Sequence, residues 1–336
     1  MPRFVLPETR PATSASLVGI ARLAAQSPQV HGKRDVEYFS LASKSILNRC
    51  SSSRMPFTWT INPYRGCEFG CKYCYARYTH EFMGMEDSAQ FEEKIYSKDR
   101  ADEILKKELG KQPGGAIAVG TATDPYQPAE RHFETTRKIL QTISRFRGLQ
   151  VSITTKSDLI RRDLKLLLEI ALYNDVRVNM TVTTMRAGLA RCLEVRAPRP
   201  DLRLQAVAEL AHAGIPTAVF AMPVLPGITD RTRDLEDVAR AASRAGACYF
   251  AINVLFLMPS AQKAFFPFLE VQFPHLVERY RRIYASSAYL RGEYPAKIEL
   301  LASELRGKYN LTDRQHGHPA ALMASPQMEL FAEKRC

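Results

Sequence analysis

From Phe57 onward, short apolar and often β-branched runs alternate with longer stretches in which apolar residues recur at helical spacing. Six of the apolar runs have the length of a strand and are bounded by turn residues. The predicted strands span 58–62, 116–120, 151–155, 176–182, 217–223 and 249–257. This alternation is typical of repeated β-α units around a parallel sheet.

Amphipathic stretches lie between the predicted strands, and several end at a glycine that stops a helix, as in HAGIP and RAGA. The predicted helices span 98–109, 129–145, 158–172, 201–213 and 231–245, with a shorter helical stretch after the first cysteines. Six units are too few for a closed barrel of eight, so the pattern predicts an α/β fold, a partial (β/α)6 TIM-type barrel. A doubly wound sheet is the alternative.

Unusual polar stretches follow the carboxyl ends of the predicted strands. They are the cysteine-containing segment after the first strand and the segments 121–128, 155–158, 183–188 and 224–230. In a β/α barrel, the loops at this end of the strands build the active site. We therefore expect the functional side chains to gather there.

The pattern divides the chain into four parts. Residues 1–55, interrupted by prolines and the stretch SSSR, are predicted to form an N-terminal arm with short helices. The barrel is predicted at 56–258 and a C-terminal helical extension at 259–311, because helical patterns follow the last strand. Residues 312–336 have little periodicity and are predicted to be a flexible tail.

Composition adds a preference for polyanionic partners. The chain has 47 Lys and Arg against 35 Asp and Glu, a net charge of +12. This excess favours nucleic-acid binding, although it is equally explained by solubility alone. The longest apolar run is far shorter than a membrane span and no signal-peptide pattern precedes the arm, so we expect a soluble, cytoplasmic protein without a membrane partner.

Three of the seven cysteines, Cys67, Cys71 and Cys74, form a C-x3-C-x2-C motif. A disulfide framework is the weakest interpretation of cysteines in a reducing compartment. Structural zinc needs four nitrogen or sulfur ligands, and no second cysteine or histidine pair follows, although His80 offers one further donor. An iron–sulfur cluster held by three thiolates would keep one iron open for a substrate or cosubstrate.

The motif, placed after the first strand of a partial barrel, resembles that of the radical S-adenosylmethionine (SAM) superfamily. The resemblance implies that Cys67, Cys71 and Cys74 bind a [4Fe-4S] cluster and that SAM occupies the fourth iron. It also implies reductive cleavage of SAM to a 5′-deoxyadenosyl radical, with electrons from a donor such as flavodoxin or ferredoxin. Tyr73 matches the aromatic residue that lies against the SAM adenine, and core packing is the competing interpretation of its role.

Several segments between about Ser43 and Tyr284 resemble, in order, the family of DNA-repair photolyases related to spore photoproduct lyase. Among them are NPYRGCEFGCKYCYAR, GTATDPYQPAE, TKSDLIRRDLKLL and PVLPGITD. The resemblance implies a role in the repair of damaged DNA. It also implies SAM contacts at the strand ends, and the candidate residues are Thr121, Thr123, Asp124, Lys156, Asn179 and Thr183. For each of them, an internally satisfied turn or strand-end group is the alternative.

The hydrogen-atom donor is not assigned by this resemblance. Spore photoproduct lyase has a cysteine near the end of the second strand, whereas this chain reads GTATDP there and has no cysteine between Cys74 and Cys192. The candidate donors are Tyr75, Tyr126 and Cys192. Reversal of spore photoproduct by the cysteine mechanism is therefore not expected.

The segment QMELF near the C-terminus resembles the peptide with which bacterial repair and replication proteins bind the DNA sliding clamp. Leu330 and Phe331 would be the apolar anchors, while Gln327 and Met328 complete the motif. The last turn of a packed helix is the alternative.

The sequence thus predicts a radical SAM enzyme that acts on damaged DNA. Two alternatives stay open. One is a radical SAM enzyme acting on RNA, a peptide or a small molecule, and the other is a non-catalytic, metal-bearing module that binds nucleic acid.

Overall fold

A computed structural model describes residues 17–33, 35–52 and 55–312, and its largest sheet confirms the six predicted strands. Neighbouring strands of this sheet follow the order β11-β10-β9-β8-β7-β4-β3. All pairs are parallel except β3 with β4. The bounds are β3 Leu47–Arg49, β4 Trp59–Ile61, β7 Ile117–Val119, β8 Gln150–Thr155, β9 Asp175–Thr181, β10 Thr217–Val224 and β11 Tyr249–Val254.

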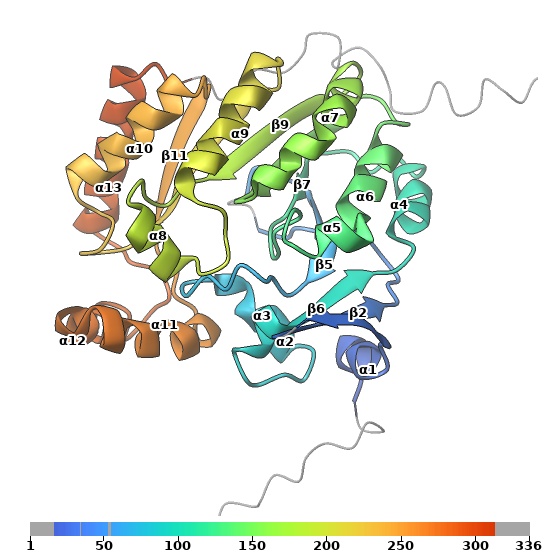
Figure 1. The fold of residues 1–336 in the computed structure, drawn as a ribbon, viewed down its shortest axis with the longest axis horizontal. Helices are drawn as coiled ribbons and strands as arrows, with labels where there is room; N and C mark the ends of the chain where they lie inside the picture. Colours follow the sequence, from blue (N-terminus) through green and yellow to red (C-terminus); the bar gives the residue numbers. More distant parts are fainter. Residues whose placement is uncertain (1–16, 34, 53–54, 313–336) are drawn as a thin grey trace, which may run out of the picture.

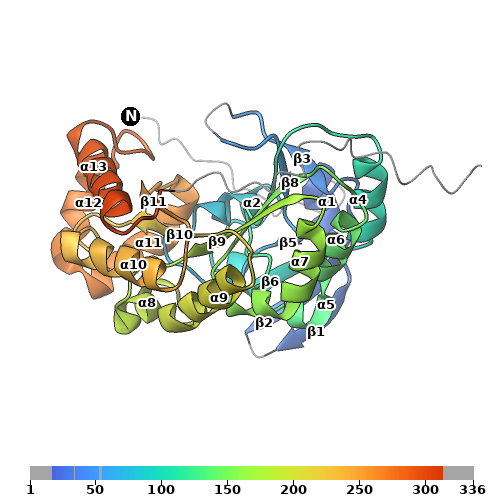
Figure 2. The same cartoon turned by 90° about the horizontal axis from the view of Figure 1, so that it is seen from above.

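Helices cover this sheet and complete the β-α units. In Figures 1 and 2, α7, α9 and α10 lie along the same side of β8, β9 and β10. The connecting helices are α4 Ala101–Leu109, α5 Glu130–Phe133, α6 Thr135–Ile143, α7 Leu164–Ala171, α8 Ala187–Leu193, α9 Pro200–His212 and α10 Thr232–Arg244. The helix predicted at 129–145 is divided at Glu134, whose φ of 50° ends α5 before α6 begins.

The sheet interior is a continuous apolar core. Ile153, Val178, Val219 and Phe250 come from four successive strands and are fully buried. Such β-branched and aromatic residues favour strands and account for most of the burial free energy, about 25 cal/mol per Å² of apolar surface. The result is the α/β, partial-barrel architecture that the pattern predicted.

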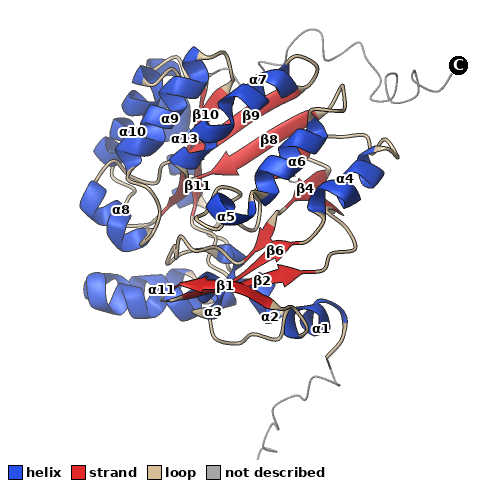
Figure 3. Cartoon of the chain, turned by 45° about the vertical axis from the view of Figure 1, so that its right-hand side comes forward, coloured by secondary structure: helices blue, strands red, loops and turns tan. Residues whose placement is uncertain are grey.

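A second, four-stranded sheet was not predicted. Its strand order is β1-β2-β6-β5, with bounds Gln29–Lys33, Val36–Leu41, Lys94–Lys98 and Tyr64–Arg65. Figure 3 shows β1, β2 and β6 set apart from the large sheet, with α1 (Gly19–Ala25) beside them. Thus the region predicted as an arm with short helices contains, besides α1, the strands β1, β2 and β3. Strand β5 joins this small sheet to the cysteine loop.

The C-terminal helices share a core with the cysteine loop. They are α11 Pro259–Gln272, α12 Val277–Ile283 and α13 Glu293–Lys308. Phe265 and Leu269 of α11 and Tyr280 of α12 belong to the same buried cluster as Cys67 and Cys71. Helix α13 packs against β11 instead. No described helix is both long and apolar enough to span a membrane.

Candidate functional site

The cysteine loop follows β4 and β5 and is held by main-chain contacts on both sides. Gly66 has a φ of 81°, and a Cβ there would lie 2.7 Å from the Lys94 carbonyl oxygen, so only glycine fits. The Cys67 N–H donates to the Phe91 carbonyl at 2.9 Å. On the other side, the Lys72 N–H donates to the Leu193 carbonyl at 2.9 Å. The loop is therefore clamped between α3 (Gln90–Glu93) and the last residue of α8.

The three thiols are shielded from solvent and unoxidised. Cys67 and Cys71 are each 8% exposed, Cys74 is half-buried, and none forms a disulfide. Burial raises the pKa of all three thiols. Neighbouring thiols of the motif raise the pKa of Cys67 and Cys71 further, while Lys156 lowers that of Cys71 and Arg77 lowers that of Cys74. Buried thiols of this kind ionise when they bind a cationic metal centre.

The donor geometry does not fit a single metal ion. Among the residues that the structure describes, no three His, Cys, Asp or Glu side chains converge as ligands of one ion. Structural zinc requires four such donors about 2.0 to 2.3 Å from one centre. His80 is used elsewhere, because its Nε2–H donates to the Lys94 carbonyl at 3.0 Å and its ring packs against Phe91. Thiols that bind different irons of one cluster need not converge, so the set fits an iron–sulfur cluster better than zinc.

Tyr73 is fixed by a buried polar network. Its hydroxyl lies 3.1 Å from Thr183 Oγ1 and donates to Glu194, and Thr183 donates to the same carboxylate at 2.7 Å. The other oxygen of Glu194 is 2.5 Å from the Arg203 guanidinium. Although burial opposes the charge, Arg203 and Lys156 keep the pKa of Glu194 below its ordinary value. The tyrosine ring is thereby held in one orientation beside the cysteines.

Sequence reasoning missed Glu194 and Arg203. Both are 1% exposed, which is unusual for charged residues and requires each to be paired. They occur in the segment RCLEVRAPRPDLRLQ, where charged residues read as ordinary solvent-exposed positions. The available signal was the position of this segment after the fourth predicted strand, at the end of the barrel where sites are built.

The predicted SAM contacts on the loop after β7 are engaged within the protein. Thr123 Oγ1 donates to the Gly66 carbonyl at 2.6 Å, which ties this loop to the cysteine loop. Asp124 accepts from Thr155 Oγ1 at 2.6 Å and from the Lys156 N–H at 2.7 Å. Thr121 Oγ1 accepts from the Asn62 side chain at 3.0 Å. These residues brace three loops against one another, and direct contact with SAM stays a prediction.

Lys156 and Asn179 are placed differently. In the described part of the chain, the Lys156 ammonium makes no hydrogen bond or ion pair, and it lies 5.8 Å from the centroid of the Tyr73 ring. Its charge acts on Cys71, Glu194 and Asp124. Asn179 is 7% exposed and donates to Thr154 Oγ1 at 3.2 Å. Among the described residues, Lys156 is therefore a cation of this region that contacts an aromatic ring and has no carboxylate partner.

The three candidate hydrogen donors lie in separate environments. Tyr75 directly follows Cys74, is 40% exposed and donates to the Thr121 carbonyl. Tyr126 is fully buried near the carboxylates of Asp163 and Glu130. Cys192 is exposed on α8. Of these, Tyr75 alone combines exposure with a position adjoining the cysteine motif.

The fold and the three-thiol site define a member of the radical SAM class, and comparison with known proteins agrees. The Radical SAM superfamily model matches residues 61–242, more than half of the chain. This chain belongs to the radical SAM superfamily. An uncharacterized protein of Mycobacterium tuberculosis is 32% identical over 332 residues, with 96% of each chain covered. An uncharacterized protein of Methanocaldococcus jannaschii is 28% identical, with 58% of this chain and 70% of the relative covered.

Among solved structures, the fold is similar to that of spore photoproduct lyase. The structure of that enzyme complexed with dinucleoside spore photoproduct has a TM-score of 0.62 at 15% identity, with 86% of both chains covered. A mutant of the enzyme with bound AdoMet and dinucleoside spore photoproduct also has a TM-score of 0.62, at 14% identity and the same coverage. At this identity the similarity concerns the fold.

Proposed function

We propose that this protein is a radical SAM enzyme that holds a [4Fe-4S] cluster through Cys67, Cys71 and Cys74 and acts on damaged DNA. The observation that carries the proposal is the set of three thiols, two buried and one half-buried and none in a disulfide, that one clamped loop holds at the strand ends. When bound, the cluster supplies one electron that cleaves SAM to methionine and a hydrogen-abstracting 5′-deoxyadenosyl radical. A flavodoxin or ferredoxin is the proposed source of that electron.

The chain's own residues would bind and orient SAM. Lys156 offers an ammonium for the SAM carboxylate, since it directly follows β8 and makes no hydrogen bond or ion pair within the described residues. Tyr73 offers an aromatic face whose position is fixed by Thr183 and Glu194. Asn179 and Thr183, on and after β9, are proposed to reach the ribose. Asp124 and Thr123 position the loops rather than react.

Three aromatic side chains support a nucleic-acid substrate. Phe256 and Tyr289 stack with centroids 4.1 Å apart, and Tyr75 is 6.1 Å from Phe256. Tyr75 and Tyr289 are exposed, at 40% and 48%. Because Tyr75 adjoins Cys74 and Phe256 follows β11, this aromatic shelf lies at the strand ends. Exposed aromatic faces suit the stacking of an unpaired base, which contributes about 1–3 kcal/mol per base.

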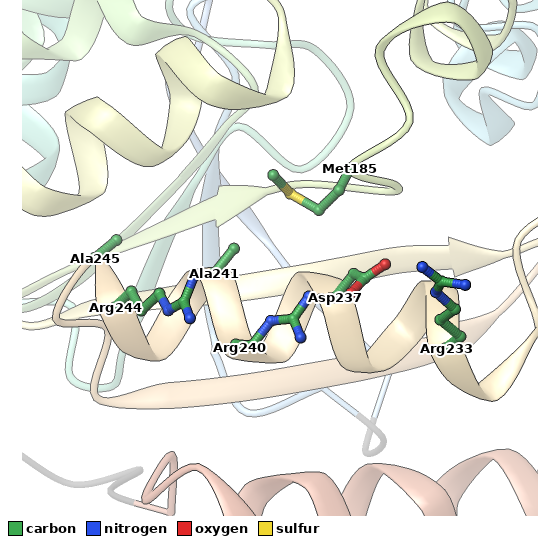
Figure 4. Close-up of a pocket in the computed structure, with 7 residues that line it drawn as sticks. All are labelled: Met185, Arg233, Asp237, Arg240, Ala241, Arg244 and Ala245. Carbon is green, nitrogen blue, oxygen red and sulfur yellow. Dashed lines mark hydrogen bonds and ion pairs between the residues drawn. The ribbon is translucent and has the colours of Figure 1, made fainter.

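A row of arginines supports contacts with the phosphate backbone. Arg233, Arg240 and Arg244 occur at helical spacing on α10, and Figure 4 shows them lining one hollow with Met185. Asp237 neutralises Arg240, leaving net positive charge on this surface. Together with the overall excess of basic residues, the row suits a polyanionic partner.

The lesion is proposed to differ from spore photoproduct, or its repair to use another donor. Spore photoproduct lyase was solved with a dinucleoside spore photoproduct. Here the loop after β7 contains no cysteine. Tyr75 is the proposed hydrogen donor because it directly follows Cys74 and is 40% exposed, although its hydroxyl donates to the Thr121 carbonyl in this structure.

Two further elements of the proposal concern the cell. We propose a cytoplasmic location, and none of the six cysteines with described structure forms a disulfide, as expected of a reducing compartment. The clamp-binding peptide with Gln327, Met328, Leu330 and Phe331 lies outside the described residues, and we propose it as a tether to the sliding clamp.

Anaerobic reconstitution tests the proposal. The protein should take up about four iron and four sulfide per chain and should form 5′-deoxyadenosine from SAM when reduced. Cys71→Ala should abolish both, whereas Cys50→Ser, a half-buried cysteine outside the motif, should retain both. Uptake of zinc without SAM cleavage would instead support the non-catalytic binding module.

The substrate arm of this experiment uses lesion-bearing and undamaged oligonucleotides. Lesion-bearing DNA should accelerate 5′-deoxyadenosine formation, and Tyr289→Ala should reduce this acceleration while SAM cleavage without DNA is unchanged. If no DNA accelerates SAM cleavage, the radical chemistry is still supported, but the substrate would then be RNA, a peptide or a small molecule.

A further inference from the structure

A basic cavity lies between α1 and the small sheet, outside the site described above. Its volume is about 550 Å³, which is in the range of sites for nucleotide-sized ligands. Four cationic residues line it, Arg22, Lys44, Arg65 and Lys98, together with neutral polar and apolar residues. No acidic residue is among those that line it. The cavity is therefore strongly positive.

Lys98, the last residue of β6, is the most unusual of these cations. Its side chain is only 7% exposed, and in the described ranges its ammonium has neither a hydrogen bond nor an ion pair. The guanidinium Nε of Arg65, on the neighbouring strand β5, is also buried without a partner. Buried charged groups are normally paired, because removing a charged group from water without an opposite charge beside it costs several kcal/mol. Among the described residues, Lys98 thus has no ion pair and its neighbour Arg65 has an unsatisfied Nε, which together indicate that an anion completes the site.

The carboxylate that acts on Lys98 does not form an ion pair with it. Glu108 of α4 acts on Lys98 only at a distance. Its oxygens accept from Ser45 Oγ at 2.6 Å, from the Leu47 N–H at 2.9 Å and from the Ile46 N–H at 3.1 Å. The carboxylate is thus committed to holding the 45–47 segment. That arrangement shapes the cavity wall and leaves Lys98 free for a ligand.

We propose that this cavity binds the phosphate group of a nucleotide unit. Lys98 and Arg65 would contact the phosphate oxygens, since an ammonium and a guanidinium are the side chains best suited to that anion. Ser43 and Asn48 line the same wall and offer further donors, and Ile20 and Leu23 of α1 offer an apolar surface for a sugar or base. Arg22 and Lys44 are exposed and would attract the anion from solvent.

The phosphate can come from two sources, a nucleic-acid strand or a free nucleotide. A strand would make this cavity an anchor for the substrate of the proposed enzyme, since Arg65 is joined to Cys67 through Gly66 alone. That part of the inference rests on the proposed function. The binding of a phosphate group to this cavity does not depend on the proposed function.

Binding to the reconstituted full chain tests the inference. The probes are inorganic phosphate, thymidine monophosphate, thymidine and a short single-stranded oligothymidylate, measured by calorimetry or fluorescence anisotropy. Lys98→Met keeps the apolar stem of the side chain and removes its charge. The affinity for the phosphate-bearing probes should fall about tenfold or more. The substitution should also lower the slope of log affinity against log salt for the oligonucleotide by about one. Lys107→Gln, an exposed lysine on α4, is the matched control and should change little.

Two results would overturn the inference. One is equal affinity of Lys98→Met and Lys107→Gln for every phosphate probe, and the other is binding of thymidine as tight as that of its monophosphate. If Lys98→Met fails to fold, the exposed pair Arg22→Gln and Lys44→Gln replaces it, with at least a threefold loss expected. Tight binding of the oligonucleotide alone identifies a strand as the source, and comparable binding of the monophosphate identifies a free nucleotide.

The same variants separate this inference from the proposed function. SAM cleavage without DNA should be equal in the parent protein and in Lys98→Met. If DNA does not accelerate SAM cleavage while monophosphate binding depends on Lys98, the DNA substrate is refuted and the cavity stands. If DNA accelerates cleavage equally in both proteins, with equal binding of every probe, the cavity inference is refuted and the function stands.

Discussion

The His80 side chain shows how burial alone changes the chemistry of a residue. It is 1% exposed, its Nε2–H donates to the Lys94 carbonyl, and Nδ1 has no partner. The pKa of His80 is lowered to about 4, chiefly by burial and also by the nearby charges of Arg65, Arg77 and Lys94, while the hydrogen bond to the Lys94 carbonyl opposes them. The imidazole is therefore neutral in the folded protein well below the pH at which it is protonated in the unfolded chain.

We predict acid lability from this residue. Between about pH 6.5 and 4 the unfolded chain binds a proton at His80 that the folded chain does not, so the free energy of unfolding should fall by about 3 kcal/mol as the pH is lowered. Urea unfolding followed by circular dichroism measures this. His80→Gln keeps a hydrogen-bond donor but cannot become charged, so it should flatten the slope. His212→Gln, at an exposed position, should not. An unchanged slope in His80→Gln would contradict the assignment.

At the scale of elements, one buried ion pair joins α8, α9 and the cysteine loop. Arg203 of α9 contacts Glu194 and donates to the Thr181 carbonyl at 3.0 Å and the Pro198 carbonyl at 2.7 Å. The main chain of Glu194 in turn forms an isolated antiparallel β-bridge with the main chain of Cys71 in the loop. Its burial means that the pair specifies how these segments meet, and removing one partner leaves the other charge uncompensated.

We predict that Arg203→Met destabilises the protein by about 3–5 kcal/mol, measured by chemical denaturation. The double variant Glu194→Gln with Arg203→Met should lose less than the sum of the single variants, because the two residues act as a pair. Arg199→Ala, which removes an exposed arginine paired with Asp201 two residues away, is the control and should be nearly neutral. Equal stability of Arg203→Met and Arg199→Ala would be incompatible with a structural role of the pair.

On the scale of the whole molecule, the proposed activity combines a shielded radical site with basic surfaces that would hold a long substrate. The C-terminal helices α11 and α12 close over the cysteine loop in one apolar cluster. Lys98's cavity and the α10 arginine row are separate features of the same chain. A tether to the clamp would raise the local concentration of the enzyme on DNA without any change in the radical site.

We predict that Leu330→Ala with Phe331→Ala abolishes binding to the sliding clamp, because the two apolar anchors supply most of the contact. SAM cleavage should be unchanged, since these residues belong to the tail. A clamp pull-down compares this variant with Lys334→Ala, a control at the same end of the chain. No binding by the parent protein, or equal binding by the double variant, would refute the tether.

The sequence by itself determined the six parallel strands, the connecting helices and the cysteine loop. The reason is that periodic burial and turn chemistry are local properties, and parallel strands bring the loops after them to one edge. Even the division of the helix predicted at 129–145 depends on a local feature, the left-handed backbone of Glu134. The residue types of the loop also predict its chemistry, because three thiols in eight positions have few uses.

Only the tertiary structure decided which charged residues are buried and what they meet. Strand β6 pairs with β2, more than fifty residues away, and with β5 on its other side, and these pairings bring Lys98 and Arg65 to the wall of one cavity. From the sequence alone, Glu194 and Arg203 are expected to be solvent-exposed charges. They are buried as an ion pair because α8, α9 and the cysteine loop pack together. Periodicity reports which face of an element is apolar. Whether a polar side chain on that element is satisfied, strained or free for a ligand depends on partners supplied from distant parts of the chain.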